Sequence, residues 1–338
     1  MRSDIWFIFS SLLAVCSLCV SNDLQADTAS SNSKTKLKPA EEKPFPWLTG
    51  PLLTPSGHVI PKGHWNIEPY EFVQTNHGVY DHRWHTHSIP HNFYIAQTQV
   101  PVQYGLGYRM DFTFSPAWSW QHTHGASHWV LNDMNYGFDV QILADKEARW
   151  WPAIKLALRG NLPIGKYQHL SSKALGTDAG GSGSWAPAVG ITMSHLYWWG
   201  GHIFFAARMN WQYTFQTPVH VRGLNVYGGG HHCAGKAYPG QVLVGQFGFE
   251  LALSQRWALA GDVQYQHINR TRFKGSPGSS HGVPNPVGAP SQDQWSLAPA
   301  IEYNWSPYVG IIAGVWFSVA ARNSPEFATA VVAVNIYK

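Results

Sequence analysis

The feature that most limits the fold is a period of two in the apolar residues, repeated along most of the chain. It is clearest over residues 106–114, where one face would carry Leu106, Tyr108, Met110, Phe112 and Phe114. Similar runs cover 134–142, 154–161 and 203–215. Side chains that alternate in this way belong to β-strands. Tilted runs of about ten residues are also long enough to cross the hydrocarbon layer of an outer membrane.

The connections between these runs predict the topology. We expect twelve strands, at roughly 63–75, 91–102, 104–117, 132–144, 150–162, 184–198, 202–215, 241–254, 256–269, 292–305, 307–321 and 325–337. Short turns alternate with longer connections, expected at 76–90, 116–131, 163–183, 216–240, 270–291 and 322–325. This order predicts an all-β fold: a single antiparallel transmembrane β-barrel over residues 47–338, with short periplasmic turns and long extracellular loops.

Composition agrees with a membrane barrel. Only 12% of residues are charged, yet mean hydropathy is slightly negative and no segment after the N-terminal one has the 18 apolar residues of a membrane helix. A barrel explains both facts, because its lipid face is apolar and its lumen is polar. Many of the seventeen Trp residues fall at the ends of the runs. That placement predicts two aromatic girdles at the membrane interfaces.

The N-terminal segment predicts export. Residues 1–26 have the charged start and short apolar stretch of a signal peptide. The residues before Cys16 resemble a lipoprotein box, except that Val15 stands where a small residue is usual. Residues 27–46 are polar and Pro-containing, which predicts a disordered periplasmic tail. Cys233 is the only cysteine after the signal peptide, so the chain has no internal disulfide.

Two short motifs carry a family resemblance. Gly50-Pro51 begins a turn-rich stretch before the first strand, and Leu162 to Lys166 reads Leu-Pro-Ile-Gly-Lys at the end of another. These motifs resemble those of the MetA-pathway of phenol degradation family of outer-membrane proteins. The resemblance implies a barrel that moves small, often apolar or aromatic compounds across the outer membrane, with no catalytic residues.

The polar face of the runs predicts the lining of the lumen. Charges of both signs occur there and nearly balance, which disfavours a strongly ion-selective pore. They line a solute pathway or, alternatively, form a salt-bridged plug in a narrow barrel that side chains or an inserted segment nearly close. The charged lumen-lining residues we expect are Arg109, Asp111, Asp139, Lys155, Arg159, Arg208, Glu250, Asp262 and Glu302.

Histidine is unusually frequent, with eighteen residues, and many fall in the expected extracellular loops. Pairs such as His85-x-His87 offer two nitrogens to a transition metal, and Cys233 adds a soft ligand beside His232. The alternative is that these side chains simply hydrogen-bond to each other and to water. The candidate metal-binding residues are His82, His85, His87, His122, His124, His231 and His232.

An enzymatic alternative rests on His169-Leu170-Ser171, which has the His-x-Ser spacing of outer-membrane acyl hydrolases. The pair falls in a loop away from the expected membrane boundary, and no Gly-x-Ser-x-Gly accompanies it. We therefore expect no enzyme and no cofactor. The net charge of +4 is not gathered in a stripe, so nucleic acid is not an expected partner.

The sequence thus predicts a monomeric, porin-like channel or transporter in the outer membrane of a Gram-negative bacterium. Its expected partners are outer-membrane lipid, a small solute and the barrel-assembly machinery. The alternating last strand, 325–337, is similar to the terminal strands by which such barrels are recognised for assembly. The alternative is a cell-surface binding or adhesion protein whose histidine-rich loops capture transition metals.

Overall fold

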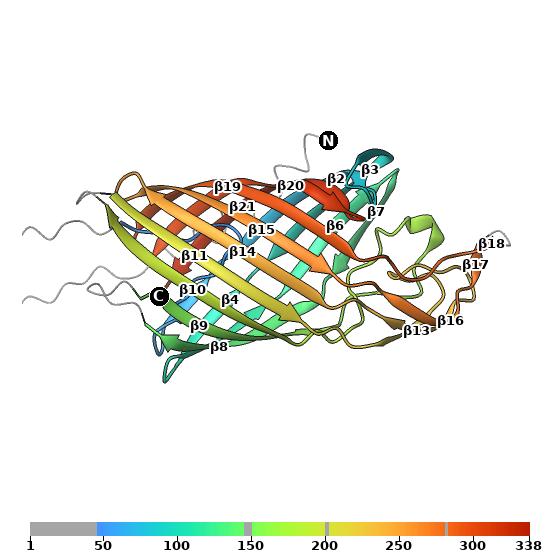
Figure 1. Cartoon of the computed structure of the whole chain (residues 1–338), viewed down its shortest axis with the longest axis horizontal. Helices are drawn as coiled ribbons and strands as arrows, with labels where there is room; N and C mark the ends of the chain where they lie inside the picture. The colour runs from blue at the N-terminus through green and yellow to red at the C-terminus, as the bar shows by residue number, and fades with distance from the viewer. Residues whose placement is uncertain (1–45, 145–150, 200–202, 281–282) are drawn as a thin grey trace, which may run out of the picture. The chain divides into compact units, whose positions relative to one another are not determined.

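Alternating strands pair edge to edge until the sheet closes on itself (Figure 1). The computed structural model describes residues 46–144, 151–199, 203–280 and 283–338. The expected signal peptide and nearly all of the expected tail lie outside the described residues. Each pair of neighbouring strands is antiparallel, and the last strand closes the barrel by pairing with the first, with Asn66 opposite Tyr337. This pairing confirms the predicted twelve-stranded barrel. Its closure leaves no unpaired strand edge.

Four of the twelve wall strands are interrupted, so that sixteen named strands build the wall. The interrupted ones are β1 with β2 (Trp65–Ile67, Tyr70–Tyr80), β3 with β4 (Thr86–Gln99, Val102–Gly107), β5 with β6 (Met110–Ser115, Ala117–Thr123) and β7 with β8 (Ala126–Leu131, Met134–Leu143). The other eight are β9 (Ala153–Leu162), β10 (Ala188–Trp199), β11 (Ile203–Thr214), β14 (Val242–Ala252), β15 (Trp257–Ile268), β19 (Gln292–Ser306), β20 (Val309–Arg322) and β21 (Pro325–Tyr337).

The interruptions lie side by side in neighbouring wall strands. Pro69, Pro101 and Pro116 occupy three of them. Proline has no backbone N–H to give to the ladder, so a strand bends or breaks where it occurs. The three carbonyl groups still accept backbone hydrogen bonds, at 3.0 to 3.1 Å. The wall is therefore kinked along one line but remains closed by hydrogen bonds.

The predicted strand at 104–117 is wrong. Residues 106–114 do not form a single strand, because a tight turn at Tyr108 and Arg109 separates β4 from β5. Both residues have positive φ, 50° and 62°, as two-residue hairpin turns require. Arg109 is exposed in this turn, so its prediction as a lumen-lining residue was wrong.

Two of the predicted long loops are instead extensions of the wall. The β2–β3 connection spans only residues 81–85, and β6 and β7 are joined at His124 and Gly125. β2 pairs with β3, and β6 with β7, almost to the tips of the two hairpins. The backbone groups of these extensions therefore hydrogen-bond to each other rather than to water. The short turns expected after residue 144 and before residue 202 lie outside the described residues.

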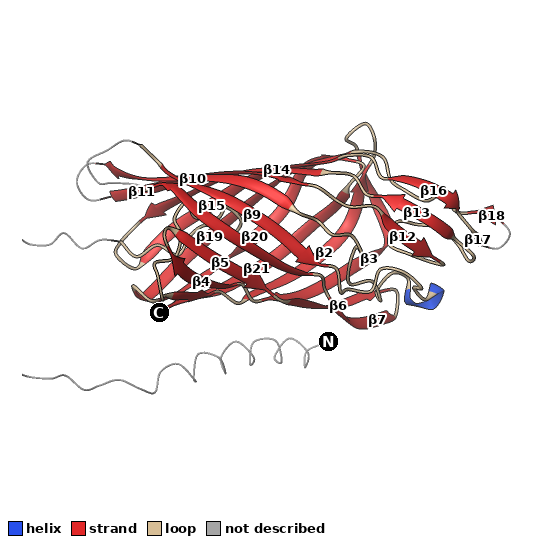
Figure 2. Cartoon of the chain, turned by 90° about the horizontal axis from the view of Figure 1, so that it is seen from below, coloured by secondary structure: helices blue, strands red, loops and turns tan. Residues whose placement is uncertain are grey.

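The three longest connections, 163–187, 215–241 and 269–291, fold together at one end of the barrel (Figures 1 and 2). We call this body the loop cap. It contains a sheet of β12 (Val219–Arg222), β13 (Ala234–Tyr238) and β16 (Arg272–Ser276), a small hairpin of β17 (Ser279–Ser280) and β18 (Val283–Pro284), and the 3₁₀ helix η1 (Ser172–Ala174). Its core is formed by Val219, Val221, Cys233 and Ala237.

Aromatic side chains stand on the outside of the wall at both ends. At the short-turn end, the rings of Trp65 and Tyr104 are 4.4 Å apart, and those of Trp257 and Tyr303 are 4.7 Å apart. At the long-loop end, Trp295 packs on a tyrosine ring at 4.8 Å. Such belts fit the two headgroup regions of a membrane. No helix among the described residues is long and apolar enough to cross a bilayer.

Candidate functional site

The chain enters the barrel wall only after crossing its interior. Residues 46–61, which we call the inner segment, run through the short-turn end of the lumen. The backbone N–H of Trp47 donates to Gln255 in the β14–β15 turn, and Gly63 donates to Gly105 on the opposite part of the wall. The inner segment contains four prolines and lacks the period of two, so it cannot serve as another wall strand.

Three buried carboxylates of the wall hold the backbone of the inner segment. Asp262 on β15 accepts hydrogen bonds from the backbone N–H groups of Leu53 and Thr54, at 3.1 and 2.9 Å, and from the Thr54 hydroxyl at 2.6 Å. Glu302 on β19 accepts from the N–H of residue 49 at 3.0 Å, and Asp111 on β5 accepts from that of residue 60 at 2.8 Å. A carboxylate in this setting needs N–H donors because it has lost its water.

Neutral contacts complete the fit of the inner segment. Gln141 on β8 accepts from the N–H of Val59 at 3.0 Å and donates to the carbonyl of Gly57 at 2.8 Å. A Cβ at Gly57 would lie 2.6 Å from the Ser194 hydroxyl, so only glycine fits this approach to β10. Leu52 is buried against a cluster of small and branched residues: Ala260, Ala298, Ile312, Val331 and Ala333.

Other charged side chains of this half of the lumen form ion pairs with each other. Asp139 on β8 pairs with Lys155 at 2.7 Å and also with Arg159, both on β9. Arg208 on β11 pairs with Glu250 on β14 at 2.8 Å. Removing one partner from such a buried pair leaves an uncompensated charge. These contacts therefore fix the wall strands on which the inner segment rests.

The structure places eight of the nine predicted lumen residues on the interior side, and Arg109 is the exception. Those eight do not form an open lining. Three hold the inner segment, and the others form ion pairs around it. The alternative of a barrel partly closed by salt bridges and an inserted segment therefore describes the short-turn half of the lumen.

Beyond the inner segment, the lumen contains a cavity of about 540 Å³, which we call the chamber. Its lining comes from the ends of β9 and β11 that lead into the long loops, from the start of β10, and from β3, β6 and β8. Six of its fourteen lining residues carry amide side chains: Gln97, Gln99, Asn132, Asn135, Asn161 and Gln212.

Connection 163–187 folds over the chamber and forms its roof. Asp133, between β7 and β8, accepts hydrogen bonds from the N–H of Gly165 at 2.9 Å and from the N–H and hydroxyl of Ser182 at 2.8 and 3.0 Å. Asn161 accepts from the N–H of Ala186 at 2.7 Å. The backbone of Gly180 lines the chamber directly. The roof is thus tied to the rim by specific side chains.

An ion pair outside the barrel also shapes the roof. Burial alone would raise the pKa of Asp178, but Lys166, 2.5 Å away, and the N–H of Ser171 outweigh it and hold this pKa below its usual value. Asp178 therefore remains charged at neutral pH and fastens both ends of this part of the connection. The connection expected at 163–183 is therefore an ordered part of the protein.

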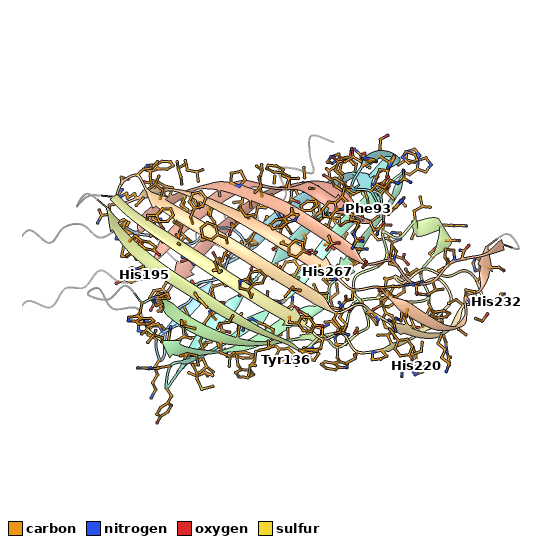
Figure 3. The ribbon with its side chains drawn as sticks, viewed as in Figure 1. Phe93, Tyr136, His195, His220, His232 and His267 are labelled. Carbon is orange, nitrogen blue, oxygen red and sulfur yellow. The ribbon has the colours of Figure 1, made fainter. Side chains whose placement is uncertain are left out.

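The predicted metal-binding histidines are spread over several elements. His91 and His124 stack at 3.8 Å between ring centroids, and His122 stacks on Trp120. Figure 3 shows His220 and His232 on the loop cap, apart from Phe93 on β3. Among the described residues, no group of three or more His, Cys, Asp or Glu side chains is placed to hold a metal ion. Metal capture by His82, His85, His87, His122, His124, His231 and His232 remains a prediction.

Two of these histidines support a turn. In the β2–β3 connection, His87 Nε2 lies 3.1 Å from Asp81 Oδ2, and the N–H groups of Arg83 and His85 donate to the other oxygen. These hydrogen bonds, that of His87 foremost, lower the pKa of Asp81 well below its ordinary value. The contacts explain how the hairpin turns within five residues.

The His-x-Ser pair does not form a catalytic arrangement in the structure. The Ser171 hydroxyl accepts a hydrogen bond from the N–H of Lys173 and acts as the N-cap of η1. Within the described ranges, no hydrogen bond joins His169 to Ser171. His169 has a positive φ of 54°, as a turn residue of the roof. A nucleophile needs its base within hydrogen-bond reach, and this pair lacks that contact.

No protein-family model and no curated protein matches the sequence. By structure, the chain is similar to an outer membrane channel from Pseudomonas putida F1, with a TM-score of 0.66, 10% identity, and coverage of 84% of this chain and 98% of that one. Weaker likenesses include the β domain of the Bordetella autotransporter BrkA (TM-score 0.45, 7% identity, 81% and 99% covered) and the CymD monoaromatic hydrocarbon channel (0.39, 8%, 82% and 89%). The likeness to the Pseudomonas putida F1 channel shows that the chain has the barrel fold of that protein.

Proposed function

We propose that this protein is a monomeric outer-membrane channel that passes a small solute and is closed at its periplasmic end by the inner segment. The short-turn end faces the periplasm, and the loop cap faces outward. The aromatic residues at both ends of the wall would place it in the membrane of a Gram-negative bacterium. The alternating β21 fits insertion by the barrel-assembly machinery.

One observation carries this proposal: the chamber lies inside a closed wall and ends at a segment that is held by side-chain hydrogen bonds and by the packing of Leu52, not by strand pairing. The inner segment is not paired into the sheet, so it can leave the lumen without breaking the wall ladder. A passage would open when its contacts with Asp262, Glu302 and Asp111 exchange for water. No chemical step is required, and no cofactor is implied.

The family resemblance supports the same function. Gly50-Pro51 lies in the inner segment, and Leu162 to Lys166 joins β9 to the roof of the chamber. The two motifs therefore lie at the two ends of the proposed passage. We include the resemblance to the MetA-pathway of phenol degradation family in the proposal on this ground.

Single-channel conductance in planar bilayers tests the proposal. In Asp262→Ala, the inner segment loses three hydrogen bonds, so we expect open events several-fold more frequent than in the unchanged chain. Asp293→Ala is the matched control, because Asp293 binds Arg322 and His267 and not the inner segment. Folded protein that carries no current, in the unchanged chain and in Asp262→Ala alike, would contradict the proposed function.

A further inference from the structure

The chamber is lined by many neutral amide side chains, unlike the ion-paired interior at the short-turn end. Its residues come from six wall strands and the roof, and the volume of about 540 Å³ falls within the range of small-molecule pockets. We propose that the chamber selects an uncharged, hydroxyl-rich solute of the size of a simple sugar. This inference rests on the proposed channel function and names the class of solute.

The charged side chains at the chamber are already occupied. Arg159 is held by Asp139, and Asp133 receives three hydrogen bonds from the roof. These are the only charged residues in the lining, all of which lies in the described part of the chain. An ionic solute entering the chamber would lose water and gain no free counter-charge.

Carboxamide groups, by contrast, remain open to a solute. Gln97 on β3 and Asn135 on β8 both line the chamber, and within the described residues neither amide hydrogen-bonds to protein. Each carboxamide offers a donor and an acceptor, and a hydroxyl group offers the same pair. The chamber is therefore complementary to several hydroxyl groups at once.

The lining also disfavours an aromatic solute. None of the lining residues is aromatic, and the apolar ones that contribute are Ala117, Ala186 and Ala188. An apolar ring would displace water from the amides and replace none of their hydrogen bonds. The apolar or aromatic cargo implied by the family resemblance is therefore not the one that this chamber fits.

Liposome swelling with the full chain tests the inference. The probes are glucose, gluconate and glucosamine, which share their size and differ in charge. We expect glucose to enter several-fold faster than either ion. The double change Gln97→Leu with Asn135→Leu should slow glucose entry roughly tenfold, because the solute loses hydrogen bonds at two sites, and should slow gluconate and glucosamine entry less. Gln266→Leu, on β15 outside the chamber, is the control.

The outcomes separate the two claims. If the chain conducts ions but glucose enters no faster than gluconate and glucosamine, or if the double change affects all three probes equally, the solute class is wrong and the channel stands. If folded protein passes no probe and no ionic current, the channel function itself fails. If glucose entry alone falls in the double variant and not in Gln266→Leu, the inference holds.

Discussion

The two halves of the lumen are built from the same wall strands but use different chemistry. On β8, Asp139 lies in the short-turn half and is fully buried in ion pairs, whereas Asn135, four residues earlier on the same face, is exposed in the chamber. The first half is a packed interior with a segment of chain at its centre. The second is a solvated space in which neutral groups make up most of the lining. Ionised side chains thus serve to hold structure here, and amides are left to meet a solute.

The comparison predicts a large difference in stability between substitutions in the two halves. Asp139→Ala should lower the free energy of unfolding by about 3–5 kcal/mol, since it leaves Lys155 and Arg159 without a counter-charge in the interior. Asn135→Ala, on the same strand and face, should change it by less than about 0.5 kcal/mol. Urea unfolding in lipid vesicles measures both. Equal costs would break the distinction between the halves.

A smaller loss of unfolding free energy is expected for substitutions that remove a contact to the inner segment. Asp262→Ala removes the acceptor of two backbone N–H groups and one hydroxyl. Leaving buried donors without partners costs about 1–3 kcal/mol, so the same unfolding measurement should show a loss of that order. Gln266→Ala, on the same strand, serves as the control, and an unchanged Asp262→Ala protein would show that the inner segment contributes no stability.

The β2–β3 hairpin should respond to acid through Asp81. Its pKa is lowered in the folded state, so the stabilisation is present above the ordinary pKa of an aspartate and is lost as the pH falls through the lowered value. Backbone amides around residues 81–87 should therefore be protected from hydrogen exchange at neutral pH. This protection, taken relative to the intrinsic exchange rate at each pH, should be lost in strong acid. In Asp81→Asn, exchange should already be fast at neutral pH. Equal exchange in both proteins would contradict the role of this carboxylate.

The smallest expected effect is the binding of metal ions to the histidine side chains. Because the described histidines form no group of three ligands, Zn²⁺ should bind no more tightly than about 1 mM in isothermal titration. The double change His91→Ala with His124→Ala tests the stacked pair. Micromolar binding lost in this variant would instead support metal capture at the loops.

The wall could be predicted from the sequence because lipid outside and polar groups inside impose a period of two on every strand. The turn at Tyr108 and Arg109 could not. Two-residue hairpin turns are usually marked by Asn-Gly or Asp-Gly, and here Tyr108, 97% exposed, continues the apolar pattern through the turn. The apolar alternation therefore continues through a hairpin turn, and the sequence predicted one strand where there are two.

The inner segment and the chamber were less predictable, for different reasons. The stretch around Gly50 to Gly57 lacks a strand period, but nothing local shows that such a stretch enters a lumen; its partners, Asp262 and Glu302, lie more than 200 residues away. Gln97, Asn132 and Asn135 are ordinary polar positions in the sequence. They become a site only because barrel closure and the folded roof bring them around one space.

The most direct test of the central claim is cross-linking of the inner segment to the wall in intact outer membranes. Thr54→Cys and Asp262→Cys, combined with Cys233→Ser, place two thiols where the Thr54 hydroxyl and the Asp262 carboxylate now touch at 2.6 Å. A short thiol-reactive cross-linker should join this pair and should not join Thr54→Cys to Asp293→Cys at the other end of the barrel. Failure of the first pair to cross-link in folded protein, or equal linkage of both pairs, would contradict an inner segment that occupies the short-turn half of the lumen.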